Sequence, residues 1–289
     1  MTPTPIIDMF SGTGELARAV ADGLNEFTRF QSFSDNYGPA RKYLRTRFSL
    51  GVQVARDFRF QDVPEGSIVT IGAPSHDALD MAVAGGADLI VTENVPGGHR
   101  TYLDLARQLS EEHGYRTTVS SGGAWEVGAP HRRERVMLVG AKRRFEPRRI
   151  NVVRQTAPAG LLPTPSVVDR AWGLTPEQWD DVKRRYREKL HNGNGHGETV
   201  ASVLARDLDD EEIRLLQTWE NVTDAYAPPT GRTCQFMHWM MGLPYRGLDA
   251  LGLSVSAQRR LAGNAVVRLQ ARLMLQRGLT AINNTKGVI

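Results

Sequence analysis

The chain has 289 residues, a formal net charge of +4, and hydrophobic and charged fractions of 40% and 24%, values that are ordinary for a globular protein able to bury a substantial core. It contains no run of about 18 apolar residues, so we expect no membrane-spanning segment, and its first residues do not resemble a signal peptide. The single cysteine, Cys234, excludes an internal disulfide and a cysteine-built metal site. We therefore expect a cytoplasmic protein without a bound metal.

The chain opens with an apolar run over residues 6–9, which passes through a small-residue turn into a helical pattern beginning near Leu16. This order predicts the strand, glycine turn and helix that begin a doubly wound nucleotide-binding sheet. Gly12 and Gly14 allow the backbone to approach a ligand closely, and the start of the helix directs free N–H groups toward it. A dehydrogenase is the less favoured alternative, because the turn lacks the usual third glycine, although the alanine at 17 is tolerated in that position.

A second strand is predicted over residues 27–34, followed by a helix from Pro39 to about residue 47. Asp35 follows this strand, at about the spacing from Gly14 that is typical of an acid binding the two ribose hydroxyls. The alternative for Asp35 is an N-cap of the following helix. Beyond it, a third strand is expected over 52–60, where Asp57 could accept the amino group of an adenine and Phe58 could pack on its ring.

Four more strands and one helix continue the alternation, over residues 67–72, 88–92, 116–121 and 136–140 for the strands and 102–112 for the helix. Only about ten residues lie between Asp77, in the turn after the first of these strands, and the start of the second, which is barely enough for a parallel crossover. The alternation predicts an α/β domain with a parallel-type sheet over residues 1–140.

From residue 141 the alternation is lost, and arginine, proline, alanine and glycine become frequent. We expect a small second lobe over 141–235, followed over 236–289 by C-terminal helices that return to the first domain. Helices are predicted over 176–190, 199–218, 236–241 and 256–277.

Basic residues gather in two parts of the chain. One set lies at 132–135, 142–144 and 148–149, and the other at 183–187. They are either solvated faces of helices and loops or a surface that tracks the phosphates of a polyanion.

Several segments, in this order, resemble motifs of the DNA (cytosine-5)-methyltransferase family of phage and bacterial type. They are DMFSGTG at 8–14, ENV at 93–95, HRRERV at 131–136 and GNAV at 263–266, with WMMGLP at 239–244 similar to the segment before the last motif. The resemblance covers nearly the whole chain. It implies a Rossmann-like sheet that binds S-adenosylmethionine, a small target-recognition lobe, and double-stranded DNA held between them.

The resemblance also assigns roles to individual residues. The family flips the target cytosine out of the duplex, so Glu93 would contact N3 and the exocyclic amine of this base. Arg133 and Arg135 would brace its O2 and the flanking phosphates. The residues expected to form the cofactor pocket are Phe10, Ser11, Gly12, Gly14, Asp35, Asp57, Phe58, Pro74, Asn264 and Val266.

The sequence departs from the family at the nucleophile. Where the family has Gly-Pro-Pro-Cys-Gln, this chain has GAPSHD at 72–77, with Ser75 at the second proline and His76 at the cysteine. Neither side chain supplies the soft, readily ionised thiolate that attacks C6 of cytosine. Cys234 precedes an apolar helix and is better explained as a buried structural residue than as a substitute nucleophile.

Three interpretations follow. The first is a methyltransferase with altered chemistry, in which Ser75 and His76, together with Asp77 and beside Glu93, orient an exocyclic nitrogen and accept its proton. The second is a catalytically inactive homologue that still binds DNA and S-adenosylmethionine. The third is one subunit of a two-chain methyltransferase whose partner supplies the nucleophile.

Overall fold

The chain forms two compact units in a computed structural model, which describes residues 2–48, 51–73, 75–166, 199–229, 232–245 and 249–285, with 175, 177, 178, 180, 181, 184 and 185. The first unit contains residues 1–123, 134–152 and 265–289, and the second contains 124–133 and 153–264. Both units are therefore assembled from separate stretches of chain. The division into functional segments at 140/141 and 235/236 stays a prediction.

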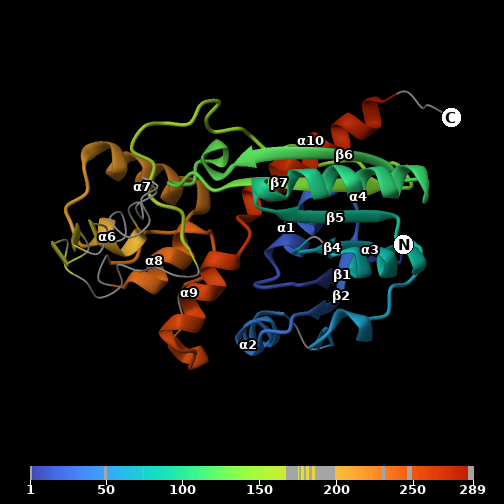
Figure 1. Cartoon of the computed structure of the whole chain (residues 1–289), viewed down its shortest axis with the longest axis horizontal. Coiled ribbons are helices and arrows are strands. Elements are labelled where there is room, and N and C mark those ends of the chain that lie inside the picture. Colours follow the sequence, from blue (N-terminus) through green and yellow to red (C-terminus); the bar gives the residue numbers. More distant parts are fainter. Residues whose placement is uncertain are drawn as a thin grey trace. The chain divides into compact units, whose positions relative to one another are not determined.

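The first unit is built on a seven-stranded mixed sheet of order β3-β2-β1-β4-β5-β7-β6 (Figure 1). Neighbouring strands from β3 to β5 are parallel, as the predicted α/β class requires, whereas β7 runs antiparallel to both β5 and β6. The connection from β6 to β7 lacks the long helical crossover that a parallel pair needs. The strands are β1 (Thr4–Met9), β2 (Thr28–Ser34), β3 (Gln53–Ala55), β4 (Ile68–Ile71), β5 (Leu89–Asn94), β6 (Arg116–Gly123) and β7 (Glu134–Ala141).

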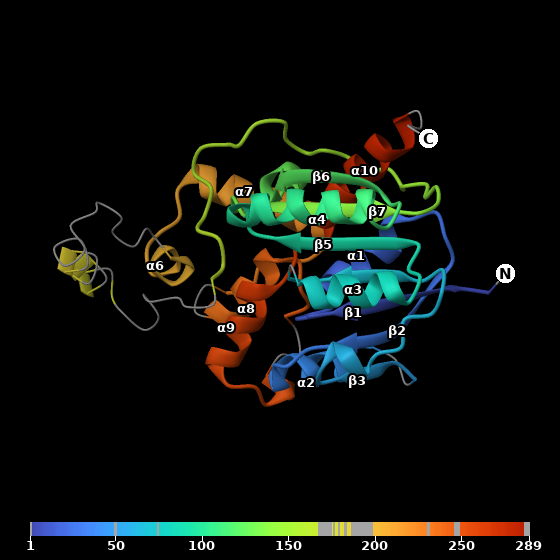
Figure 2. The same cartoon turned by 45° about the vertical axis from the view of Figure 1, so that its right-hand side comes forward.

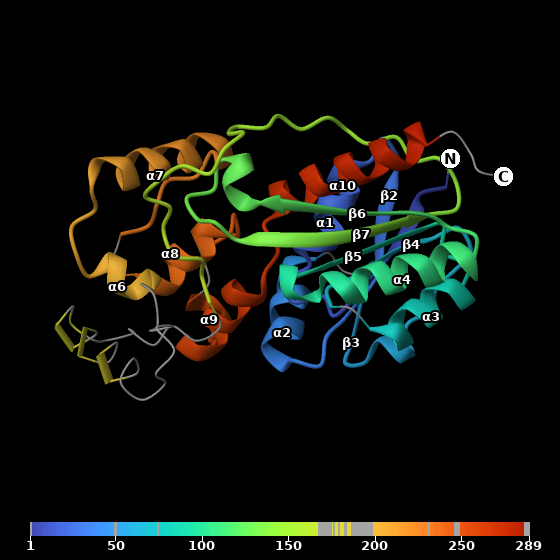
Figure 3. The ribbon, with the colours of Figure 1, turned by 45° about the horizontal axis from the view of Figure 1, so that its top comes forward.

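Helices cover both faces of this sheet because successive strand residues point to opposite sides. Ile6 packs in the core beneath α1 (Glu15–Gly23), α2 (Gly38–Arg47) and α10 (Arg268–Asn284). Ile7 packs in the core beneath α3 (His76–Ala84) and α4 (His99–Glu111). Figure 2 shows α3 and α4 on one face and α1 on the other, and Figure 3 shows α10 running beside β6 and β7.

Three predicted elements differ from the structure: the third strand, and the helices over 256–277 and 199–218. The third strand has three residues and is followed by a 3-10 helix, Phe58–Phe60, because the Asp57 side chain accepts a hydrogen bond from the Arg59 N–H and starts a turn. The predicted helix over 256–277 is two helices, α9 (Val255–Asn264) and α10. Its interruption contains two valines, and Val267 has an extended backbone with φ −75° and ψ 107°, consistent with the low helix propensity of β-branched residues. By contrast, the short connection between the strands predicted over 67–72 and 88–92 does form a parallel crossover, because α3 joins the parallel strands β4 and β5.

The second unit is helical in the part that the structure describes. Trp219 donates its indole N–H to the Trp239 carbonyl at 2.9 Å, and Trp239 donates to the Ala225 carbonyl at 2.7 Å. The predicted helix over 199–218 is also two helices, since the Asp209 side chain caps the second one. The predicted helix over 176–190 lies largely outside the described residues. The described helices of this unit are α6 (Val200–Leu204), α7 (Asp210–Thr223), α8 (Thr233–Met240) and α9, with the 3-10 helices Ala124–Val127 and Asp249–Leu251. In the first unit, a 3-10 turn, Pro96–Gly98, precedes α4.

Within the described ranges, no helix combines the length and apolar character needed to cross a membrane.

Candidate functional site

The glycine turn after β1 has an unusual backbone. Phe10, Gly12 and Gly14 all have left-handed conformations, with φ of 55°, 54° and 75°. A Cβ atom added to Gly14 would lie 2.8 Å from the ring of Phe48, so the position lacks room for any side chain. Ser11 stabilises the turn from inside, since its hydroxyl donates to the Asp8 carbonyl at 2.9 Å and accepts from the Ser34 N–H at 3.1 Å.

Asp35 links this turn to the start of α2. Its Oδ2 accepts a hydrogen bond from the Gly12 N–H at 2.8 Å, and its Oδ1 accepts one from the Tyr37 N–H, also at 2.8 Å. The N-cap position of α2 is held by Tyr37, so the alternative of an N-cap at Asp35 is wrong, and the carboxylate closes a local turn instead. Each carboxylate oxygen can accept a further hydrogen bond, which leaves capacity for a ligand hydroxyl.

A pocket of about 540 Å³ opens where β1 and β2 end and the 3-10 helix begins. Its volume is in the range of small-molecule sites. It brings together four of the residues expected to bind the cofactor, and the rings of Phe10 and Phe58 pack with their centroids 5.2 Å apart. The lining residues are Phe10, Ser34, Asp35, Asn36, Arg56, Asp57, Phe58, Arg59, Phe60 and Asp77.

Arg56, Arg59 and Phe60 also line the pocket and were not expected there. Arg59 and Phe60 belong to a 3-10 helix where a strand was predicted, and Arg56 precedes it. The alternation of arginine with aromatic residues over 56–60 was the available signal.

Asp57 is already engaged by a neighbour. Arg59 donates to its carboxylate through Nη2 at 2.5 Å and through Nε at 3.1 Å. These side-chain hydrogen bonds lower the pKa of Asp57 to about 2. The carboxylate is therefore charged at neutral pH, and a ligand amino group would share it with Arg59.

The remaining residues expected to bind the cofactor do not line this pocket. Ser11, Gly12 and Gly14 form the turn beside it, and Val266 is buried in the core of the first unit. Asn264 is the exposed last residue of α9 in the second unit. Pro74 lies outside the described residues.

Glu93 and Arg135 form an ion pair at the edge of the sheet where the parallel strands end. Arg135 Nε lies 2.9 Å from Glu93 Oε1, and the two side chains are 13% and 7% exposed. The antiparallel register brings them together, because Asn94 pairs with Val136. Burial lowers the pKa of Arg135, and the charge of Glu93 opposes this shift.

Arg133 lies in the second unit and has a different environment. It is 4% exposed, it has a left-handed backbone with φ of 30°, and its guanidinium donates to the Gly263 carbonyl at 3.2 Å. His131 in the same motif is buried, with Nε2 3.0 Å from the Met240 carbonyl. Within the second unit, this motif therefore contacts the ends of α8 and α9.

The residues that replace the family's cysteine loop begin α3. The Ser75 hydroxyl accepts a hydrogen bond from the Ala78 N–H at 3.3 Å and caps the helix. His76 and Asp77 are exposed at its first turn. In the described part of the chain, no hydrogen bond joins His76 to Ser75 or Asp77, so these residues do not form a connected relay.

Cys234 is buried near the start of α8, with Sγ 3.8 Å from the Val255 carbonyl oxygen. Among the residues that the structure describes, no group of three or more His, Cys, Asp or Glu side chains could hold a metal ion.

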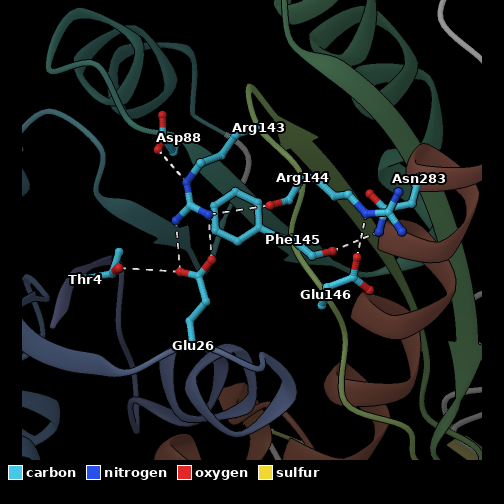
Figure 4. Close-up of polar contacts among 8 residues, drawn as sticks. All are labelled: Thr4, Glu26, Asp88, Arg143, Arg144, Phe145, Glu146 and Asn283. Atoms are coloured by element: carbon cyan, nitrogen blue, oxygen red, sulfur yellow. Dashed lines mark hydrogen bonds and ion pairs between the residues drawn. The ribbon is translucent and has the colours of Figure 1, made fainter. Parts of the chain in front are cut away.

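The basic stretch after β7 is engaged in internal contacts (Figure 4). Arg143 donates to both oxygens of Glu26, at 2.6 and 2.9 Å, and to Asp88 at 2.7 Å. Arg144 pairs with Glu146. In the second basic cluster, Arg184 and Arg185 pair with Asp181. This arrangement favours the interpretation of these arginines as partnered surface residues over that of a phosphate-binding surface.

No protein-family model matches the chain, and no curated protein matches it by sequence. Solved structures do match. An Entamoeba histolytica methyltransferase, EhMeth, aligns with 96% of this chain and 98% of its own, at 14% identity and a TM-score of 0.53. A protein described as a DNA modification methyltransferase encoded within an E. coli prophage aligns over 97% and 99%, at 15% identity and a TM-score of 0.52. A DNMT2 variant from Spodoptera frugiperda aligns over 94% and 98%, at 14% identity and a TM-score of 0.51.

These alignments extend over nearly the full length of both partners, and at such low identity they establish the fold. The chain has the mixed, mostly parallel Rossmann-like fold of methyltransferases.

Proposed function

We propose that this chain binds S-adenosylmethionine and acts on a flipped cytosine in double-stranded DNA, with chemistry that differs from C5 methylation through a cysteine. The observation that carries the proposal is the pocket at the glycine turn, where Phe10, Asp35 and Phe58 meet. The motif order along the sequence and the methyltransferase-like fold support it. Its setting in a bacterial or phage-infected cell is part of the same proposal.

The residues of the pocket fit the proposed cofactor. Gly14 lies in the turn beside the pocket, and it has no space for a side chain because Phe48 and Leu44 pack against it. Asp35 has acceptor capacity for the ribose hydroxyls, Asp57 for the adenine amine, and the Phe10–Phe58 pair for the ring face. The bound cofactor would supply an electrophilic methyl group.

The proposed base site is the Glu93–Arg135 pair. The Glu93 carboxyl group can accept a hydrogen bond from the exocyclic amine of cytosine, and its ion pair with Arg135 fixes its orientation. Arg133 lies in the second unit and donates to the Gly263 carbonyl there, and its role toward the base remains what the resemblance implies.

The absence of a thiolate at 75–77 favours transfer to the exocyclic amine, which needs no covalent adduct. The amine nitrogen would bond to the methyl carbon as the carbon–sulfur bond breaks, and the nitrogen would release one proton. The exposed side chains of His76 and Asp77, in the loop that replaces the cysteine, are the candidates to accept this proton. Ser75, whose hydroxyl caps α3, is better suited to hold the loop than to react.

A second candidate is an inactive homologue that retains the cofactor and DNA sites. The unconnected His76 and Ser75 favour it, because a working relay requires linked groups. A two-chain methyltransferase, with the nucleophile on a partner, is the third candidate.

The test combines calorimetric titration with S-adenosylmethionine and transfer of a tritiated methyl group to DNA, followed by mass spectrometry of the nucleosides. Failure to bind at high micromolar cofactor would refute the proposal. N4-methylcytosine would support exocyclic transfer, and 5-methylcytosine would show that another group replaces the thiol. Cofactor binding without methyl transfer would favour the inactive homologue or the two-chain enzyme. Adding a candidate partner chain distinguishes them, because only the two-chain enzyme would then transfer the methyl group.

A further inference from the structure

A buried ion pair joins the start of α1 to the end of α2, and neither of its residues lines the pocket that the proposed function uses. Glu15, the first residue of α1, is 1% exposed, and its Oε1 lies 2.9 Å from Arg47 Nη2 at the end of α2. Arg18 reaches the same oxygen at 3.4 Å. Arg47 also donates to the Tyr43 hydroxyl at 2.9 Å, which fixes the guanidinium on α2.

This pair is costly for the folded state. Glu15 Oε2 and Arg47 Nε are both buried, and neither has a hydrogen-bond partner among the described residues. Burial raises the pKa of Glu15, an effect that nearby Arg18 and Arg268 oppose and Asp22 reinforces. A buried pair with unsatisfied atoms is commonly less stable than an apolar replacement, so stability alone does not account for it.

The pair completes a two-point attachment of α2 to the glycine turn. At the beginning of α2, Asp35 accepts from the Gly12 N–H. At its end, Arg47 binds Glu15, and Phe48 and Leu44 approach the Gly14 position so closely that an added Cβ would lie 2.8 and 3.1 Å from them. Asp35 and Asn36 line the pocket and stand shortly before α2, so a displacement of α2 would move two of the residues that line it.

We propose that Glu15 and Arg47 are positioning residues that hold α2 against the left-handed glycine turn in the geometry that accepts the cofactor. This inference rests on the proposed function, because it concerns the affinity of the same pocket. A simpler role for Glu15, stabilisation of the α1 N-terminus through the helix dipole, would affect stability without requiring Arg47.

The experiment measures the dissociation constant of S-adenosylmethionine by calorimetry, and the unfolding temperature, for wild type, E15Q, R47M and the double variant E15Q/R47M. R143M is the matched control: it removes an arginine that also makes ion pairs in the first unit, but on residues that do not line the pocket. We expect E15Q and R47M each to weaken binding about tenfold. The double variant should bind about as weakly as either single one, because both break the same contact. R143M should lower the unfolding temperature and leave the affinity unchanged.

Wild type that fails to bind the cofactor overturns the proposed function itself. Wild type that binds, with E15Q and R47M within about twofold of it, overturns this inference and leaves the proposed function intact. Additive losses in the double variant, or an equal loss in R143M, also overturn it. If E15Q does not fold, R47K decides: it keeps the charge and loses the fork, so an unchanged affinity contradicts the positioning role and a weaker one supports it.

Discussion

At the scale of single residues, Asp8 is a carboxyl group buried beside the proposed cofactor turn. It is 1% exposed, the Thr70 hydroxyl donates to its Oδ1, and Oδ2 has no hydrogen-bond partner in the described structure. Burial raises the pKa of Asp8 from 3.8 to about 7, against the opposing hydrogen bonds from Thr70 and Ser11. The folded protein therefore favours the protonated form at a pH where the unfolded chain is ionised.

This shift predicts a pH-dependent difference between wild type and D8N. The stability from protonated Asp8 is complete below pH 3.8 and is lost as pH rises through about 7. The amide of D8N is neutral throughout, so between pH 5 and pH 8 wild type should lose about 2 kcal/mol relative to D8N. Urea unfolding of both proteins at the two pH values measures it. A constant difference between them would mean that Asp8 ionises normally in the fold.

Glu93 and Arg135 should respond unequally to substitution. E93Q leaves a neutral side chain of the same shape and should retain the fold while losing any methyl transfer. R135M leaves the Glu93 carboxylate buried without its partner and should destabilise the protein by about 3 kcal/mol. Chemical denaturation and the methyl-transfer assay measure the two effects. Transfer that persists in E93Q would place the base site elsewhere.

The local sequence was sufficient to predict the glycine turn but not the side-chain contacts that hold it in place. Two glycines after an apolar run predict a left-handed turn, because few other residues adopt positive φ. The Glu15–Arg47 pair could not be predicted, since nothing in the chain indicates which arginine the buried glutamate meets. The role of Arg133 was similarly inaccessible, because its contact with Gly263 depends on the folding of distant segments.

At the scale of elements, the contact between the start of α1 and the end of α2 makes Gly14 sensitive to any side chain. G14A introduces both a strained φ of 75° and a clash with Phe48 at 2.8 Å. We expect a loss of about 3 kcal/mol, of which about 1 kcal/mol is the backbone strain. In an F48A background the clash with Phe48 disappears and only the tight contact with Leu44 at 3.1 Å remains, so the same substitution should cost little more than the strain. Urea unfolding of the four proteins gives both values. Equal costs in the two backgrounds would show that Phe48 does not confine this position.

The predicted elements were most reliable where periodicity and end signals agreed. β1, α1, β2 and α2 lie within a residue or two of the expected ranges. Predictions failed where a local side-chain bond competed with the periodic pattern, as at Asp57, or where apolar periodicity continued through a break, as between α9 and α10. The direction of β7 depends on strand pairing, which periodicity does not report.

At the scale of the whole molecule, the positive charge of the chain is less available than the sequence suggests. Arg143 is held between Glu26 and Asp88 and lies 3.9 Å over the ring of Phe145. The hydrogen bonds from Arg143 to Glu26 and Asp88 raise its pKa, against the opposing effect of burial. The cluster after β7 therefore has local counter-charges that a polyanion would have to displace.

Arg132 differs, since it is exposed and has no ion pair within the described ranges. This contrast predicts how DNA affinity depends on salt. Each phosphate contact contributes a slope of about −0.9 to the dependence of log K on log salt concentration. R132Q should therefore flatten the slope by about 1, and R143Q should leave it unchanged while lowering stability. Fluorescence anisotropy on duplex DNA between about 50 and 200 mM salt measures both. If R143Q flattened the salt slope as much as R132Q, the interpretation of its cluster as a phosphate-binding surface would be supported again. Arg143 could contribute a phosphate contact only if DNA displaced it from Glu26 and Asp88.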